Sequence, residues 1–168
     1  MSPDLFWVPG PWRGHLVVAT RPRGGDWLAD EASGWRRAGL DMLVSLLEKD
    51  EAADLGLVNE SEAAETNGIR FIVFPIPDRG VPASLSAAVS LIAGIADALA
   101  EGKNVAVHCR QGIGRSGLIA AGVLVASGIP AERAIDTVSS VRGRTIPETP
   151  DQRLWLQRLP FEQPVASG

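Results

Sequence analysis

The 168 residues of the chain, 45% of them hydrophobic, can bury the core of one domain but not of two, so we expect a single domain over residues 1–168. The formal net charge of −4 argues against nucleic acid or an anionic membrane as a partner. A single cysteine excludes a disulfide framework and fits the cytoplasm, and one cysteine with two histidines does not make a zinc-ligand set, so we expect no metal and no cofactor.

Proline, glycine and aromatic residues crowd residues 1–14, which predicts an irregular arm or a short edge strand there. Apolar runs and helical periodicity then predict a strand at Leu16–Ala19, a helix over 26–40, a strand at Met42–Leu47, short helices or turns over 48–56 and 61–68, and a strand at Ile69–Phe74. Three prolines and a glycine make residues 75–82 a loop.

The second half of the chain continues this alternation. Its apolar pattern predicts helices over 83–100, 114–126 and 130–142, a strand at Asn104–Val107, and a last helix that begins at Thr149 or Asp151. The longest apolar run, Leu118–Ala126, is far shorter than the roughly 20 residues that cross a bilayer, so we expect no membrane span. We expect a frayed, flexible tail over residues 160–168.

Strands that alternate with helices are typical of an α/β fold with a central, mainly parallel sheet flanked by helices. In such sheets, ligands bind beyond the carboxyl ends of the strands. The loops after Phe74 and after Val107 both follow strands, so we expect them to meet at one edge of the sheet. The second loop, between the central strand and a buried helix, is the candidate anion site.

The segment from Cys109 to Ser116 has the residue types that an oxyanion site needs. Glycines let the backbone curl so that several N–H groups face one point, and the helix that follows adds its positive end. We expect phosphate to be bound by Arg110, Gln111, Gly112, Ile113, Gly114 and Arg115. The guanidinium of Arg115 can hold two phosphoryl oxygens. Cys109 would ionise readily and act as the nucleophile, and Ser116 is placed to donate a hydrogen bond to its sulfur.

Each of these residues also has an ordinary structural interpretation. A lone cysteine is often a small buried hydrophobe, and a serine at the start of a helix is often only a cap. The combination favours the reactive interpretation, because a cation such as Arg115 is unfavourable in the first turn of a helix unless an anion lies there. His108 either orders the loop through its ring hydrogen bonds or is a satisfied core histidine, and we assign it no proton transfer.

Cleavage of a phosphate ester also needs an acid that protonates the leaving oxygen. Asp78 is the candidate, because prolines on either side of it fix the direction of the loop after Phe74. An aspartate before Arg79 and Gly80 is also a common turn residue. The presence of the cysteine loop favours the acid over the turn residue.

The sequence His-Cys-Arg-Gln-Gly-Ile-Gly-Arg-Ser at 108–116 is similar to the signature of the cysteine-dependent protein tyrosine and dual-specificity phosphatases. Residues 75–80 resemble the general-acid loop of the compact members, including those similar to the cyclin-dependent kinase inhibitor 3 phosphatase. The likeness covers about residues 40–160. It implies a metal-independent reaction in which Cys109 attacks phosphorus to form a phosphocysteine while Asp78 protonates the leaving group. Water then hydrolyses the intermediate with Asp78 as base.

The resemblance also has implications for which residue positions the hydrolytic water and for the type of substrate. Residues 148–152 are similar to the segment that positions the hydrolytic water, which implies this role for either Glu148 or Gln152. The chain has no tyrosine that could stack on a phosphotyrosine ring, so a Trp or Phe must do so or the pocket is shallower. Arg110 and Gln111 stand where the inositol-lipid phosphatases of this family have lysines, which weakens a lipid interpretation.

The leading hypothesis is therefore a monomeric protein phosphatase that acts on phosphotyrosine, with phosphoserine and phosphothreonine as further candidates. A second hypothesis is sulfur transfer or arsenate reduction, which also use a cysteine in an anion loop but predict no role for Asp78. The third is a phosphate-binding module without catalysis. It ranks last, because Cys109, Arg115 and Asp78 are all present.

Overall fold

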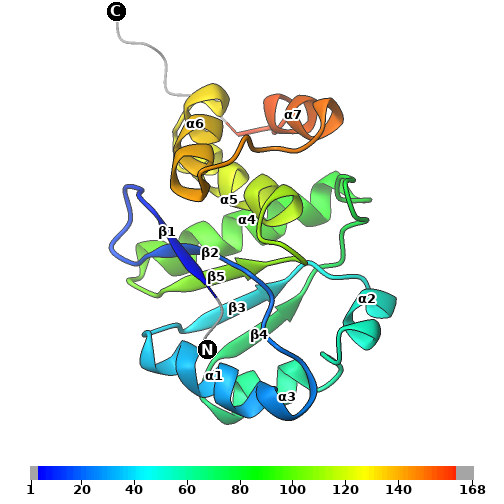
Figure 1. The fold of residues 1–168 in the computed structure, drawn as a ribbon. Helices are drawn as coiled ribbons and strands as arrows, with labels where there is room; N and C mark the ends of the chain where they lie inside the picture. The colour runs from blue at the N-terminus through cyan, green and yellow to red at the C-terminus, as the bar shows by residue number, and fades with distance from the viewer. Residues whose placement is uncertain (1–3, 162–168) are drawn as a thin grey trace, which may run out of the picture.

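The computed structural model describes residues 4–161, and in it five strands form one sheet in the order β1-β2-β5-β3-β4 (Figure 1). The strands are β1 (Leu5–Val8), β2 (Leu16–Ala19), β3 (Met42–Ser45), β4 (Arg70–Val73) and β5 (Val105–His108). β2, β5, β3 and β4 run parallel, and β1 pairs with β2 in the antiparallel direction. The predicted α/β fold with a mainly parallel sheet is confirmed.

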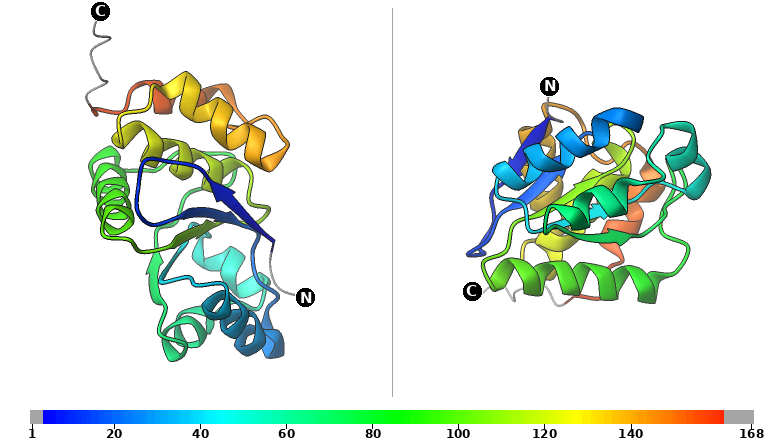
Figure 2. Two further views of the ribbon diagram at one scale, coloured as in Figure 1. Left: turned by 90° about the vertical axis from the view of Figure 1, so that its left-hand side faces the viewer. Right: turned by 90° about the horizontal axis from the view of Figure 1, so that it is seen from below.

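Within residues 4–161, seven α-helices and one 3-10 turn (Gly25–Trp27) connect and flank these strands. The helices are α1 (Leu28–Arg37), α2 (Lys49–Asp54), α3 (Glu60–Thr66), α4 (Leu85–Ala100), α5 (Gly114–Ala126), α6 (Ala131–Arg142) and α7 (Pro150–Gln157). In Figures 1 and 2, α1 and α3 cover one face of the sheet, while α4 and α5 cover the other and α6 and α7 lie beyond α5. None of these helices has both the length and the apolar character of a membrane-spanning segment.

The two faces of the sheet carry separate apolar cores because side chains alternate along a strand. In β5, Val105 and Val107 belong to the larger core under α4 and α5, whereas Ala106 belongs to the smaller core under α1 and α3. All four residues of β5 are buried, as expected for a central parallel strand covered on both faces. This burial holds the end of β5, from which the cysteine loop departs.

The N-terminal segment, for which we expected an irregular arm or an edge strand, contains the edge strand β1. Leu5 lies opposite Ala19 in the register with β2, and the ring of Phe6 lies 4.0 Å from the guanidinium carbon of Arg142. The strand therefore links the start of the chain to α6. Residues 1–3, and residues 162–168 of the predicted tail, lie outside the described part of the chain.

Candidate active site

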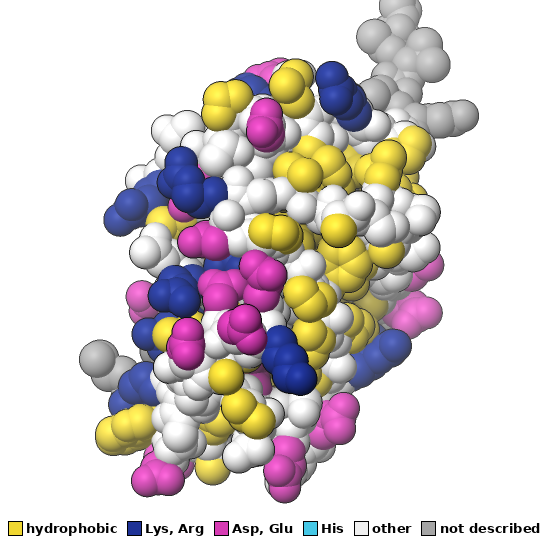
Figure 3. Space-filling view, turned by 90° about the vertical axis from the view of Figure 1, so that its right-hand side faces the viewer, with side chains coloured by type: hydrophobic (Ala, Val, Ile, Leu, Met, Phe, Trp, Pro, Cys, Tyr) yellow, Lys and Arg dark blue, Asp and Glu magenta, His cyan; other side chains and the backbone are white. Residues whose placement is uncertain are grey.

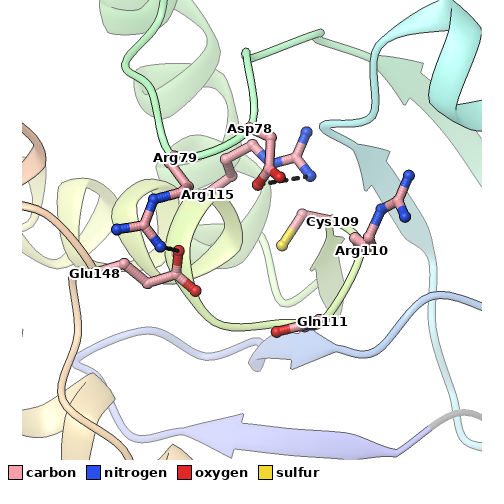
Figure 4. A pocket seen from close by; sticks show the side chains of 8 residues that line it. Asp78, Arg79, Cys109, Arg110, Gln111, Arg115 and Glu148 are labelled. Carbon is pink, nitrogen blue, oxygen red and sulfur yellow. Dashed lines mark ion pairs between the residues drawn. The ribbon is translucent and has the colours of Figure 1, made fainter.

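Eight residues line a pocket of about 150 Å³ where the loops after β4 and β5 come together. They are Asp78, Arg79, Cys109, Arg110, Gln111, Gly114, Arg115 and Glu148. Figure 4 shows the Cys109 sulfur among these side chains, with Asp78 and Arg79 on one side and Glu148 below Arg79. Pockets for drug-sized ligands measure about 300–1,000 Å³, so this one suits a small group such as a phosphoryl.

Two glycines allow the loop after β5 to pack as tightly as it does. Gly112 has φ +68°, and a Cβ there would lie 2.8 Å from the carbonyl oxygen of Ala19 at the end of β2. A Cβ on Gly114 would lie 2.9 Å from Oε2 of Glu148. A larger residue at Gly112 would push the loop off the backbone of β2, whereas one at Gly114 would displace the Glu148 side chain. The loop is therefore seated against β2 on one side and against the segment before α7 on the other.

Cys109 lies at the bottom of the pocket and is 3% exposed. Burial alone would raise the pKa of its thiol. Hydrogen bonds from the Ser116 hydroxyl and from the amides of Ser116 and Ile113, together with the charge of Arg115, more than offset this effect and hold the pKa below its ordinary value. The Ser116 oxygen lies 3.2 Å from the sulfur, where it can donate to a thiolate. The environment is therefore that of a reactive cysteine rather than of a small core residue.

The guanidinium of Arg115 is buried and held in one orientation. Its Nη1 and Nη2 donate to the two carboxylate oxygens of Glu51 at 2.6 and 3.0 Å, and Nη1 also donates to the carbonyl of Ile76 at 2.9 Å. Among the described residues, Nε has no hydrogen-bond partner. Nε and Nη2 form the edge of a guanidinium that can take two oxygens side by side, so Glu51 occupies one edge and leaves the other for a phosphoryl group.

His108 is the last residue of β5 and comes directly before Cys109, and its ring contacts residues of α1 and α3. Its Nε2 lies 2.5 Å from a carboxylate oxygen of Glu60 and its Nδ1 lies 3.2 Å from the carbonyl of Cys109. Burial would lower the pKa of His108, but the carboxylate of Glu60 and the carbonyl and thiolate of Cys109 raise it above its ordinary value. Trp35 stacks on the ring. Both expectations for His108 therefore apply, since it is a satisfied core histidine that also holds the loop.

Asp78 and Arg79 form a turn at the mouth of the pocket. The amide of Gly80 donates to the carbonyl of Pro77 at 2.8 Å, and Arg79 has φ +61°, the one non-glycine positive φ among residues 4–161. This conformation costs a non-glycine residue about 1–2 kcal/mol. The Asp78 side chain is 65% exposed, and its Oδ1 lies 3.6 Å from Nη2 of Arg115. Asp78 thus lies beside Nη2, the nitrogen that the open edge of the guanidinium shares with the edge bound to Glu51 (Figure 4).

The structure separates the two candidates for positioning water. Glu148 lines the pocket, and its Oε2 lies 3.8 Å from Nη1 of Arg79. Gln152 is fully buried and is not among the pocket residues. Its Nε2 donates to the carbonyl of Gly80 at 2.9 Å, and its Oε1 accepts from the amide of Glu148. Gln152 therefore touches the acid turn and not the space in which water would attack.

The residues expected to bind phosphate divide into those that reach the pocket with a side chain and those that do not. Arg110 and Gln111 line it, while Gly112 and Ile113 do not, and the Ile113 side chain is buried in the core. Arg142 holds the outside of the loop, since it donates to the carbonyls of Gln111 and Gly112. With the carbonyls held outward, the loop amides are free to face inward.

Sequence reasoning missed three charged residues of this site, namely Glu51, Glu60 and Arg142. Glu51 lies 64 residues from Arg115 in the chain, and in the sequence it is one of several acids around α2. The signal that could have found it is general, because a buried arginine requires a carboxylate partner. Which carboxylate fills that place depends on the fold. No three His, Cys, Asp or Glu side chains are grouped to hold a metal ion within the described residues.

Residues 17–129 match the family model described as "polymorphic toxin system, DSP-PTPase phosphatase". The chain is 37% identical over 117 residues to the mouse protein tyrosine phosphatase domain-containing protein 1, a match that covers 64% of this chain and 15% of that protein. It is 27% identical over 126 residues to cyclin-dependent kinase inhibitor 3 of the rat, which covers 74% of this chain and 59% of that protein. The chain thus spans a small part of the first of these relatives.

Solved phosphatase structures have the same fold. A kinase-associated phosphatase aligns with a TM-score of 0.84 over 93% of both chains, at 20% sequence identity. The active form of Tk-PTP aligns with a TM-score of 0.76 over 92% of this chain and 95% of that one, at 26% identity. The compact phosphatase fold expected from the sequence is therefore confirmed.

Proposed function

Because the chain belongs to the DSP-PTPase phosphatase family, we propose that it hydrolyses phosphate monoesters on protein side chains through a phosphocysteine intermediate. The observation that carries this proposal is the meeting of three groups in one small pocket. A cysteine with a lowered pKa, a buried arginine with one open edge and an exposed aspartate all face the same space. None of these groups requires a metal for the reaction that follows.

In the first step, the Cys109 thiolate attacks phosphorus and the bond from phosphorus to the ester oxygen breaks. Asp78 gives its proton to that oxygen, so the alcohol or phenol leaves neutral. Arg115 and the loop amides stabilise the negative charge on the three non-bridging oxygens of the phosphoryl group as it is transferred. The burial of Cys109 and the fixed orientation of Arg115 mean that little has to be rearranged during this step.

In the second step, water attacks the phosphocysteine while Asp78 takes up a proton, and the thiolate leaves. The Ser116 hydroxyl, 3.2 Å from the sulfur, stabilises that thiolate. We assign the positioning of the water to Glu148, because its carboxylate lines the pocket and Gln152 does not. The position of the Glu148 carboxylate in the pocket supports this choice between the two residues that the sequence left open.

The proposed substrate is a phosphorylated protein in the cytoplasm, with the enzyme acting as a monomer. No Trp or Phe lines the described pocket, which supports a shallow site that accepts phosphoserine and phosphothreonine beside phosphotyrosine. On the face that carries α2, acidic and basic side chains lie intermixed beside a band of hydrophobic ones (Figure 3). A mixed surface of this kind does not select strongly for a basic or an acidic partner.

The exposed position of Asp78 beside Arg115 favours this proposal over sulfur transfer, which has no use for an acid there. The decisive test is hydrolysis of p-nitrophenyl phosphate in excess EDTA by wild type and by Cys109→Ser. We expect activity in the wild type and none in the variant. A phosphopeptide panel with Asp78→Ala as a trap then identifies the substrate. Full activity of Cys109→Ser, or activity that EDTA removes, would reject the proposal.

A further inference from the structure

The turn that carries Asp78 is held at its two ends by different means. At the entry, Ile76 is fixed to the sheet, because its amide donates to the carbonyl of Leu46 at 3.0 Å and its own carbonyl accepts from Arg115 at 2.9 Å. At the exit, the carbonyl of Gly80 accepts from Nε2 of Gln152 at 2.9 Å. Between these points lie Asp78 and the strained Arg79. A strained turn persists only when its surroundings hold it.

The remaining contacts of the turn are weaker than the one with Gln152. The ion pair between Arg79 and Glu148 is 3.8 Å long, and the Arg79 side chain is 67% exposed. Exposed ion pairs of this kind fix geometry poorly, because water and salt screen them. Gln152, by contrast, is 0% exposed and uses both ends of its amide. It is therefore the buried contact that fixes the exit of the turn.

Gln152 is itself anchored by the start of α7. Its side-chain Oε1 accepts from the backbone amides of Glu148 and Thr149 at 3.1 and 3.3 Å. Its backbone N–H donates to the Thr149 hydroxyl at 3.2 Å. This is a capping box, in which glutamine and glutamate are the two residues commonly found. The acceptor end of Gln152 thus caps a helix, while the donor end reaches the acid turn.

We propose that Gln152 is a positioning residue for the general acid, which sets the place of Asp78 by holding the Gly80 carbonyl. This inference rests on the proposed phosphatase function. It assigns Gln152 a role other than water positioning, and it links the orientation of Asp78 to the first turn of α7. When the donor is lost, the Gly80 carbonyl turns toward water and Asp78 moves away from the leaving oxygen.

The variant that isolates this contact is Gln152→Glu. A carboxylate keeps the acceptor for the two amides, so the capping box survives, but it has no N–H for the Gly80 carbonyl. The matched control is Thr149→Ala, which weakens the same cap and leaves the contact between Gln152 and Gly80 in place. Comparison of the two separates positioning of the turn from stability of α7.

The kinetic test compares two esters that differ in their need for an acid. The leaving group of a phosphoserine peptide is the serine alkoxide, which needs a proton to leave. The leaving group of p-nitrophenyl phosphate is p-nitrophenolate, which leaves readily without one. For Gln152→Glu, we expect kcat on the phosphoserine peptide to fall about tenfold or more beyond the fall on p-nitrophenyl phosphate. For Thr149→Ala, we expect both esters to change by the same factor. Equal losses on the two esters in Gln152→Glu would overturn the proposal.

A second measurement does not depend on turnover. Hydrogen–deuterium exchange of the peptide that covers residues 76–82 should quicken in Gln152→Glu by about tenfold and stay unchanged in Thr149→Ala. Unaltered exchange in Gln152→Glu would overturn the positioning role even if the enzyme is active. Quickened exchange in a protein whose wild type hydrolyses no phosphate ester would uphold the contact and reject the proposed function instead.

Discussion

The floor and the rim of the pocket are built in different ways. On the floor, Cys109, Arg115 and Ser116 are all nearly or fully buried, and each has a partner at hydrogen-bond distance. On the rim, Asp78 and Arg79 are 65% and 67% exposed, and their ion pairs are 3.6 and 3.8 Å long. The floor is organised before substrate arrives, as electrostatic stabilisation of a transition state requires. The rim meets the rest of the substrate and can change without disturbing the floor.

The largest expected effect comes from changing an arginine on the floor rather than on the rim. Arg115→Lys loses the planar fork that holds Glu51 on one edge and the phosphoryl group on the other. We expect kcat/KM for p-nitrophenyl phosphate to fall by about 10³-fold. The matched rim variant Arg79→Lys should lose less than about twofold, because its side chain is exposed and weakly paired. Similar losses in the two variants would remove the distinction between floor and rim.

The next effect concerns the contribution of the buried pair of His108 and Glu60 to the stability of the fold. Glu60→Gln leaves His108 without its buried counter-charge, so we expect the free energy of unfolding at pH 6 to fall by about 3 kcal/mol. Glu62→Gln, an exposed change on the same helix, is the control and should have almost no effect. Urea unfolding of the two variants and the wild type measures the difference.

The same pair predicts how this difference varies with pH. The folded-state pKa of His108 is raised, so its contribution to stability is fully present below the ordinary value of about 6.5 and is lost as pH rises through the folded value. The gap in the free energy of unfolding between wild type and Glu60→Gln should therefore narrow as pH rises through the folded-state pKa of His108. Cys109, whose pKa is lowered, acts in the opposite direction, because its contribution to stability grows as pH rises. A gap that does not depend on pH would contradict the charged pair.

A smaller effect is expected at the nucleophile. Ser116→Ala removes the hydroxyl that stabilises the thiolate, a contribution of about 1 kcal/mol. We expect alkylation of Cys109 by iodoacetamide at pH 6 to slow about fivefold. Mass spectrometry can follow the reaction at one site, because the chain has one cysteine. Unchanged alkylation would mean that the amides and Arg115 alone hold the thiol pKa down.

The smallest effect on stability is expected on the rim. Glu148→Gln breaks an ion pair of 3.8 Å in which Arg79 is largely exposed, so the free energy of unfolding should change by less than about 0.5 kcal/mol. Glu51→Gln removes the charge that pairs with the buried Arg115, so it should lower the free energy of unfolding by more than Glu148→Gln does. Thermal unfolding of both variants decides the order. The reverse order would show that the rim contributes more to the fold than its exposure suggests.

The parts of this site that could be predicted from sequence are those whose chemistry is local. The spacing from Cys109 to Ser116 specifies a loop, a helix start and an arginine within a few residues, and Asp78 follows from two parallel strands that end at one edge. Glu51, Glu60 and Arg142 act across the fold. Each looks like an ordinary surface charge on its own helix, because amphipathic periodicity does not say which distant partner a side chain meets.

The same limit explains why the sequence left open the role of Gln152 and the conformation of the segment that forms β1. In the sequence, Gln152 is a helix-start glutamine near Glu148, and the choice between them for water positioning needed the direction of each side chain. β1 has four residues beside two prolines, so its pattern fits an arm as well as a strand. Pairing with β2 decides the matter, and pairing is a property of the tertiary structure.

The lone cysteine has a consequence for oxidative damage. A thiolate at the bottom of a pocket is the form that peroxide converts to sulfenic acid, and Cys109 has no second cysteine in the 168 residues with which to close a disulfide. Recovery then depends on an external thiol, and delay leads to sulfinic acid, which ordinary thiols do not reduce. Because Cys109 is 3% exposed, peroxide must enter through the mouth of the pocket, and bound phosphate should protect the sulfur by filling that path.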